Sequence, residues 1–174
     1  MEFLIRLRSR WPDVLGILIL AVTAYLYWYA PHRVEGLQAA APVLTATDLS
    51  GAALEPTVTQ NRVVVLNFWA TWCGFCKAEL PDLDALQQQL GDQGLTVLAL
   101  SVEDDRSLVQ KFWSNKGYSM SVGMAPAALQ QAYGGIEVLP TTFILDKKGV
   151  IRHRIKGAVR AGVLEELVRG YLKE

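Results

Sequence analysis

The sequence predicts an α/β fold in which helices flank a central mixed β-sheet, with an apolar helix ahead of this domain. Two uninterrupted runs rich in β-branched residues, at 62–69 and 95–101, predict buried strands, and the segment between them has helical spacing. A third run, at 14–30, carries no charge and predicts the N-terminal helix. About 130 residues remain beyond it, which is the size of one domain with one core.

The composition excludes several classes of protein. Seventeen basic and 17 acidic side chains balance, whereas a nucleic-acid-binding domain carries a basic stripe. Two cysteines are too few for a scaffold of several disulfides, and two histidines, His32 and His153, offer little for a metal site. We therefore expect no nucleic-acid partner and no resident metal.

The N-terminus has the pattern of a transmembrane signal-anchor. Residues 1–13 contain three arginines, and residues 14–30 form a 17-residue run without charge. A helix over 11–28 rises ~26 Å, close to the ~30 Å hydrocarbon core of a bilayer. The arginines precede the span, which predicts a cytoplasmic N-terminus and a single-pass inner membrane protein whose domain faces the periplasm or cell exterior.

A cleavable signal peptide is the alternative interpretation. Ala39, Ala40 and Ala41 offer a small-residue cleavage site, but they lie well beyond the apolar run, and bulky aromatic residues end that run. Both interpretations deliver the rest of the chain to the same side of the membrane. We expect residues 31–41 to be a linker and residues 42–174 to be the folded domain.

The first half of this domain alternates strand and helix. Residues 43–47 are expected to form a first strand, and residues 62–69 a strand buried on both faces. Residues 74–90 have leucines at helical spacing, and Gly91 and Gly94 end that helix.

The second half continues the alternation and ends in a hairpin and a helix. Each element is bounded by capping residues, glycine or a turn signal. We predict a strand at 95–101, a helix from Asp104 and Asp105 to about 116, a short strand at 118–122, a helix at 126–133, hairpin strands at 141–145 and 150–156, and an amphipathic helix at 160–172.

A Cys-x-x-Cys motif stands between the first long strand and its helix. Cys73 and Cys76 enclose Gly74 and Phe75, and Trp72 precedes them. A cysteine at a helix N-terminus faces unpaired backbone N–H groups and the positive end of the helix dipole, which favours the thiolate and lowers the pKa of the Cys73 thiol. Cys76 lies one turn further on and can resolve a mixed disulfide at Cys73.

Other interpretations of the two cysteines stay open at this stage. A structural disulfide across so short a loop removes little unfolded-chain entropy, and an inert buried pair leaves the strand-to-helix placement unexplained. Two thiolates also suit Cu(I), so the alternative function is copper binding or delivery. A docking protein that does not use its cysteines is a further alternative.

The run from Asn67 to Cys73, Asn-Phe-Trp-Ala-Thr-Trp-Cys, and the continuation from Cys76 to Pro81, Cys-Lys-Ala-Glu-Leu-Pro, resemble the thioredoxin superfamily. More narrowly, residues 42–172 are similar to its membrane-tethered TlpA/ResA-like branch, which includes CcmG/DsbE proteins of cytochrome c maturation and ScsD proteins linked to copper tolerance. The resemblance implies a thioredoxin-like fold and an exported thiol:disulfide oxidoreductase.

The same resemblance implies partners and direction. Branch members act on protein disulfides or dithiols, mostly as reductants, and receive electrons from a membrane reductase of the DsbD/CcdA type. Cytochrome c maturation and periplasmic redox homeostasis are the implied roles. The redox-active Cys73–Cys76 pair then needs no other cofactor.

The resemblance also implies which residues surround the dithiol. Pro140 matches a cis-proline opposite the cysteines, where it leaves the backbone of Leu139 free to pair with an extended substrate and Thr141 follows. Glu79 matches an acidic residue near the dithiol, on the helix face of Cys76, that accepts a proton during resolution. The expected substrate-binding residues are Leu139, Pro140 and Thr141, together with Trp72, Gly74 and Phe75.

Departures and neighbouring residues complete the prediction. Asn67 is neutral where thioredoxin has an acidic residue, which shifts proton transfer to Glu79. Phe75 replaces the proline that thioredoxin has between its cysteines, so the reduction potential of thioredoxin cannot be assigned to this pair. We expect Trp69 to pack in the core, residues 103–105 to form a helix cap and solvated edge, and His153 to face solvent.

Overall fold

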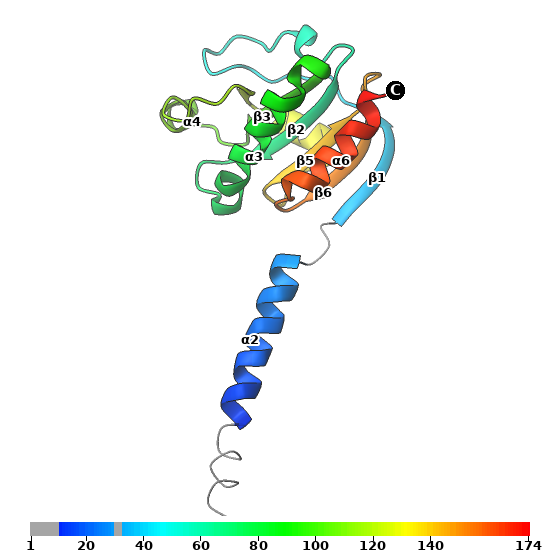
Figure 1. Ribbon diagram of the computed structural model, residues 1–174. Helices are drawn as coiled ribbons and strands as arrows, with labels where there is room; N and C mark the ends of the chain where they lie inside the picture. Colours follow the sequence, from blue (N-terminus) through cyan, green and yellow to red (C-terminus); the bar gives the residue numbers. More distant parts are fainter. Residues whose placement is uncertain (1–10, 30–32) are drawn as a thin grey trace, which may run out of the picture. The chain divides into compact units, whose positions relative to one another are not determined.

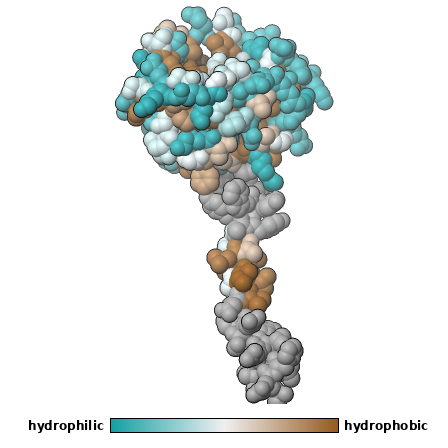
Figure 2. Space-filling model, turned by 60° about the vertical axis from the view of Figure 1, so that its left-hand side comes forward, coloured by the Kyte–Doolittle hydropathy of each residue, from teal (hydrophilic) through white to brown (hydrophobic). Residues whose placement is uncertain are grey.

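The computed structural model describes residues 11–29 and 33–174, in two units divided at residues 31 and 32. In the first unit the predicted apolar run forms helix α2 (Trp11–Tyr29). The side chains at 14–23 are exposed, and most are apolar, as Figure 2 shows. Within the described residues, no helix meets the length and hydropathy required of a membrane span. Most of the predicted cytoplasmic segment, residues 1–10, lies outside the described residues.

Residues 33–174 contain a six-stranded mixed sheet in the order β1-β6-β5-β2-β3-β4 (Figure 1). Strands β2, β3 and β4 are parallel, and β1, β6, β5 and β2 pair antiparallel. The strands are β1 (Arg33–Ala40), β2 (Val63–Trp69), β3 (Leu95–Ser101), β4 (Ser121–Met124), β5 (Thr141–Leu145) and β6 (Val150–Lys156). The helices are α3 (Gly74–Leu90), α4 (Arg106–Trp113), α5 (Ala127–Ala132) and α6 (Ala161–Leu172), with 3₁₀ turns η1 (Pro56–Val58) and η2 (Gly91–Gln93). The predicted helix at 74–90 and strands at 95–101, 141–145 and 150–156 are confirmed at both ends.

The predicted linker at 31–41 is wrong over most of its length. Residues 33–40 form β1, which pairs antiparallel with β6 as an edge of the sheet, with a register irregularity between Gly36 and Ala39. The sequence of β1, Arg-Val-Glu-Gly-Leu-Gln-Ala-Ala, has too little apolar alternation to signal a strand. Its partner supplies the missing hydrogen bonds, so tertiary pairing decides this element.

The predicted strand at 43–47 is also wrong, because only Thr47 makes bridges, to Ala53 and to Met124. The Thr47 carbonyl accepts a bond of 2.7 Å from the Met124 N–H. A Cβ at Gly123 would lie 2.7 Å from that same carbonyl, so glycine there permits the approach. The segment crosses the end of β4 instead of extending the sheet.

Strand β2 separates two apolar layers. Val63, Val65 and Trp69 point into the layer covered by α3 and α6, which lie on one face of the sheet (Figure 1). The intervening side chains of Val64 and Phe68 point into the other layer, under α5, with Leu129 and Tyr133 among its members. Burial on both faces explains the uninterrupted apolar run, since each buried Val or Leu contributes about 1.5–3 kcal/mol.

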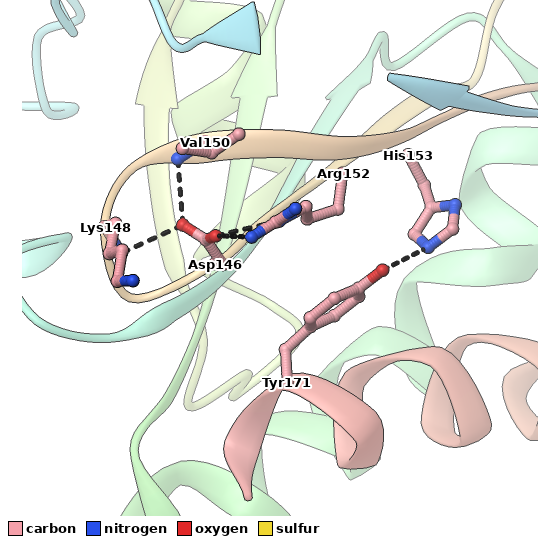
Figure 3. Close-up of polar contacts among 6 residues, drawn as sticks. All are labelled: Asp146, Lys148, Val150, Arg152, His153 and Tyr171. Atoms are coloured by element: carbon pink, nitrogen blue, oxygen red, sulfur yellow. Dashed lines mark hydrogen bonds and ion pairs between the residues drawn. The ribbon is translucent and has the colours of Figure 1, made fainter. Parts of the chain in front are cut away.

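Helix α6 is attached to β6 by polar contacts as well as by apolar packing (Figure 3). The Nε2 atom of His153 lies 2.7 Å from the Tyr171 hydroxyl of α6, so His153 faces this helix rather than solvent, contrary to the expectation. Burial, together with the charge of Arg152, lowers the pKa of His153. Arg152 pairs with Asp146 at 2.7 Å, which fixes the hairpin turn. The His153–Tyr171 contact therefore joins the last turn of α6 to β6, and the Arg152–Asp146 pair joins β6 to the turn that precedes it.

Candidate active site

The two cysteines lie at the point where strand β2 leads into helix α3. Strand β2 ends at Trp69, residues 70–72 turn, and Cys73 is the N-cap of α3. Cys73 and Cys76 form a disulfide. The predicted order of buried strand, dithiol and helix is therefore confirmed.

The two sulfur atoms differ in environment. The Sγ atom of Cys73 accepts a hydrogen bond of 3.1 Å from the Cys76 N–H, one of the amides that a helix N-terminus leaves unpaired. Cys73 is 7% exposed and Cys76 only 1%. A thiolate at Cys73 would be stabilised by the Cys76 N–H and by the positive end of the helix dipole, whereas the Cys76 side chain is buried. This arrangement suits Cys73 for attack and Cys76 for resolution.

Apolar side chains surround the entrance to the dithiol. Trp72 is 70% exposed and Phe75 is 53% exposed, and Gly74 between the cysteines is also exposed. Trp69, by contrast, is fully buried and stacks against Phe112 at 5.3 Å between ring centroids, as expected of a core residue. Large exposed aromatic groups beside a reactive sulfur are available to contact a partner protein.

Glu79 is a buried carboxyl group one helical turn beyond Cys76. It is 4% exposed, so its side chain lies in the interior and not in solvent. Its Oε1 accepts a 3.0 Å bond from the Val159 N–H, in the β6–α6 connection, and its Oε2 accepts a 3.3 Å bond from Asn67 Nδ2. Burial raises the pKa of Glu79 to about 7, against the opposing effect of these two bonds. The carboxyl group can therefore exchange a proton near neutral pH.

Asn67 connects this carboxyl group to the neighbouring strand. Its side chain is fully buried on β2, on the face toward α3. The Nδ2 atom donates both to Glu79 and to the Thr142 hydroxyl of β5, at 2.9 Å for the latter. Thr142 and Val159 escaped the sequence-based prediction because they are distant in the chain and have no recognisable motif.

The Leu139–Pro140 peptide bond is cis, as the family resemblance implies. Leu139 is partly buried and packs against both apolar clusters, one of which contains the two cysteines. The Pro140 carbonyl accepts a 2.8 Å bond from Gly157 N–H. Thr141 is buried, and its hydroxyl donates to the Val138 carbonyl at 2.7 Å. Its side chain thus shapes the loop from within.

Glu103 contacts the turn that precedes Cys73, and the sequence pattern did not predict this contact. Glu103 follows β3, and its Oε2 and Oε1 accept bonds of 2.7 Å from the backbone N–H and the hydroxyl of Thr71. Asp105, rather than the whole acidic run, caps α4 through Ser107 N–H at 2.9 Å. Because β2 and β3 are parallel neighbours, the residues after both strands meet at one sheet edge, a signal that could have found Glu103.

Among residues 11–29 and 33–174, no group of three or more His, Cys, Asp or Glu side chains is placed to hold an ion. The two sulfurs are bonded to each other, and Glu79 is occupied by two hydrogen-bond donors.

Comparison with known proteins shows the family to which this chain belongs. The Redoxin family model matches residues 36–168. The chain belongs to the Redoxin family. It is 29% identical to the thiol-disulfide oxidoreductase ResA of Bacillus thuringiensis (strain Al Hakam) over 152 residues, covering 87% of this chain and 86% of the relative. It is 33% identical to the thiol:disulfide interchange protein DsbE of Escherichia coli (strain K12) over 172 residues, covering 88% of each.

Solved structures agree with these relatives. A thioredoxin-family thiol:disulfide interchange protein from Chlorobium tepidum TLS superposes with a TM-score of 0.71 at 25% identity, over 79% of this chain and 99% of the other. A secreted thiol-disulfide isomerase from Corynebacterium glutamicum gives 0.67 at 26% identity, over 74% and 83%. The predicted thioredoxin-like fold and ResA/DsbE-like family are confirmed, and this redoxin is a thiol-disulfide oxidoreductase.

Proposed function

We propose that this redoxin reduces disulfides in exported proteins through Cys73 and Cys76. The Cys73 thiolate attacks one sulfur of a substrate disulfide, forming a mixed disulfide and releasing the other substrate sulfur as a thiolate. Cys76, once deprotonated, attacks Cys73, which forms the Cys73–Cys76 disulfide and releases the second substrate thiolate. Two electrons pass from the dithiol to the substrate. No cofactor beyond the cysteine pair takes part.

The observation that carries this mechanism is the buried carboxyl group beside the sealed cysteine. Cys76 must lose its proton where water has little access, and Glu79 lies one turn away on the same helix. With its pKa raised to about 7 by burial, Glu79 exists in both protonation states at neutral pH. It accepts the Cys76 proton as resolution begins and returns it to solvent or to the leaving thiolate.

The substrate is held by backbone pairing and apolar contact. Leu139, before the cis bond, presents its backbone to an extended substrate segment, in the manner of β-augmentation. Trp72 and Phe75 contact apolar residues beside the substrate disulfide, while Gly74 leaves room for the chain between them. Thr141 supports this surface by holding the loop from below.

We place the domain on the outer side of the inner membrane, anchored by residues 14–30. The uncharged run, the preceding arginines and the flanking aromatic residues support this placement. Electrons then come from a membrane reductase of the DsbD/CcdA type, and the substrates belong to cytochrome c maturation or general periplasmic redox homeostasis. Intact mass and membrane fractionation test the anchor. A membrane-bound chain retaining residues 1–41 supports it, and a soluble chain shortened near Ala41 overturns it.

The replacement Cys76→Ser tests the exchange mechanism. Without the resolving thiol, the mixed disulfide at Cys73 should accumulate and be released by a small reductant, which allows the substrate to be identified by mass spectrometry. The matched control, Cys73→Ser, should trap nothing. Equal trapping by both variants, or full cellular function of the double serine variant, would contradict the mechanism.

A further inference from the structure

A single carboxylate ties the turn that leads into the dithiol to the end of the neighbouring strand. Glu103 uses both oxygens on Thr71, one for the backbone N–H and one for the hydroxyl, each at 2.7 Å. Hydrogen bonds to an ionised carboxylate are shorter and about twice as strong as neutral ones. Both hydrogen-bond donors of Thr71 are therefore bound by one side chain, which comes from the loop after β3.

The carboxylate is itself held in orientation. Ser101, the last residue of β3, donates its hydroxyl to Glu103 Oε2 at 3.3 Å and accepts the Glu103 N–H at 3.2 Å. The Val102 N–H donates to the Trp69 carbonyl at 3.0 Å, so the two strand ends are also joined through their backbones. The group that orients Glu103 is therefore the last residue of β3 and not a residue of the turn that Glu103 contacts.

The turn carries the reactive residues. The Cys73 N–H donates to the Ala70 carbonyl at 3.2 Å, which places Thr71 and the exposed Trp72 at its corners. Displacing Thr71 therefore moves both the sulfur that attacks and the aromatic group that meets the substrate. A displacement of about 1 Å at a reacting centre can cost ~100-fold in rate.

We propose that Glu103 is a positioning residue for disulfide exchange at Cys73, acting through its two bonds to Thr71. The proposal rests on the exchange mechanism described above and adds a residue that does not touch the substrate or the sulfurs. Alanine at 103 would remove both acceptors, whereas glutamine would not break the link, because its amide NH₂ can donate to the Thr71 hydroxyl. Valine at 71 would remove only the hydroxyl bond and leave every charge in place.

Charge and bonding can be separated because the chain supplies a matched control. Asp104 is the next residue, it is exposed, and its carboxylate makes no bond to Thr71. Asp104→Asn removes the same charge from the same connection and leaves the turn intact. A purely electrostatic effect of Glu103 on Cys73 would be reproduced in large part by this variant.

The test is a double-mutant cycle on the reduced full-length chain in detergent, with oxidised glutathione as the probe. The dithiol gives two electrons to glutathione disulfide, and the rate of glutathione release is scaled to the folded fraction from urea unfolding. We expect Thr71→Val to slow exchange about tenfold in the parent chain but less than about twofold beside Glu103→Ala. Thr71→Ser and Asp104→Asn should stay within about twofold of the parent.

A second measurement separates positioning from general loosening. The pH midpoint of Cys73 thiolate absorbance should rise with Thr71→Val in the parent chain and stay unchanged by it beside Glu103→Ala. Equal effects of Thr71→Val in both backgrounds, or slowing by Asp104→Asn equal to that by Glu103→Ala, would overturn the inference and leave the exchange mechanism standing. A parent chain that does not reduce glutathione disulfide would overturn both.

Discussion

Replacing Glu79 with glutamine should stabilise the folded protein at alkaline pH while slowing its reaction. Burial raises the pKa of Glu79 from 4.5 to about 7. Each tenfold change in proton affinity corresponds to about 1.4 kcal/mol, so keeping this carboxylate ionised costs the folded state about 3 kcal/mol. Glutamine has a similar shape, carries no charge, and can still accept the Val159 N–H.

The sign of the pH dependence follows from proton binding. Below pH 4.5 the carboxyl group is protonated in both the folded and the unfolded chain, and the substitution should change stability little. Between pH 4.5 and about 7 only the unfolded chain loses the proton, so the stability of the parent falls as the pH rises. Above pH 7 the folded chain also carries the ionised carboxylate, and the full cost of about 3 kcal/mol is present; this cost already includes the bond from Asn67, because that bond is one of the causes that set the pKa.

Urea unfolding of the oxidised chain at pH 4 and pH 8 measures this difference. We expect Glu79→Gln to gain about 3 kcal/mol at pH 8 relative to pH 4, and to slow resolution of a mixed disulfide by about 100-fold. Glu166→Gln removes a carboxylate from the exposed side of α6 and serves as a control. A gain at pH 8 no larger than at pH 4 would refute the raised pKa. Normal resolution would refute proton transfer by Glu79.

Three further outcomes follow from burial and hydrogen bonding. Alkylation of the reduced chain across a pH series should show Cys73 reacting well below the midpoint of a free cysteine, about 8.5, with Cys76 slow throughout; a Cys73 midpoint like that of a free thiol contradicts the helix N-terminal effect. Trp72→Ala should weaken exchange with protein substrates but change the free energy of unfolding by less than about 0.5 kcal/mol, because the side chain is 70% exposed. Asp84→Ala should cost about 3 kcal/mol in urea unfolding, since the buried carboxylate accepts the Ser119 N–H at 2.6 Å and further donors that would be left unpaired; a loss below about 1 kcal/mol would mean that water replaces it.

The pattern of apolar residues was sufficient to predict the elements that are buried along a whole strand or along one face of a helix. The run at 62–69 and the helix at 74–90 were predicted almost to the residue because burial on two faces or one leaves a direct trace in the sequence. Strand β1 and the bridge at Thr47 left no such trace. Both depend on a partner strand far along the chain, and the pairing is made by backbone groups that every residue has.

The sequence by itself determined the fold class and the position of the cysteine pair: Cys73 and Cys76 at the start of a helix that follows a buried strand. Only the tertiary structure decided what surrounds them. It buried Glu79 against Asn67 and Val159, and it brought Glu103 to Thr71 across the ends of two parallel strands. The physical reason is that a cap or a periodic pattern acts within a few residues, whereas the burial of a carboxyl group, and therefore its pKa, depends on segments that meet only in the folded chain.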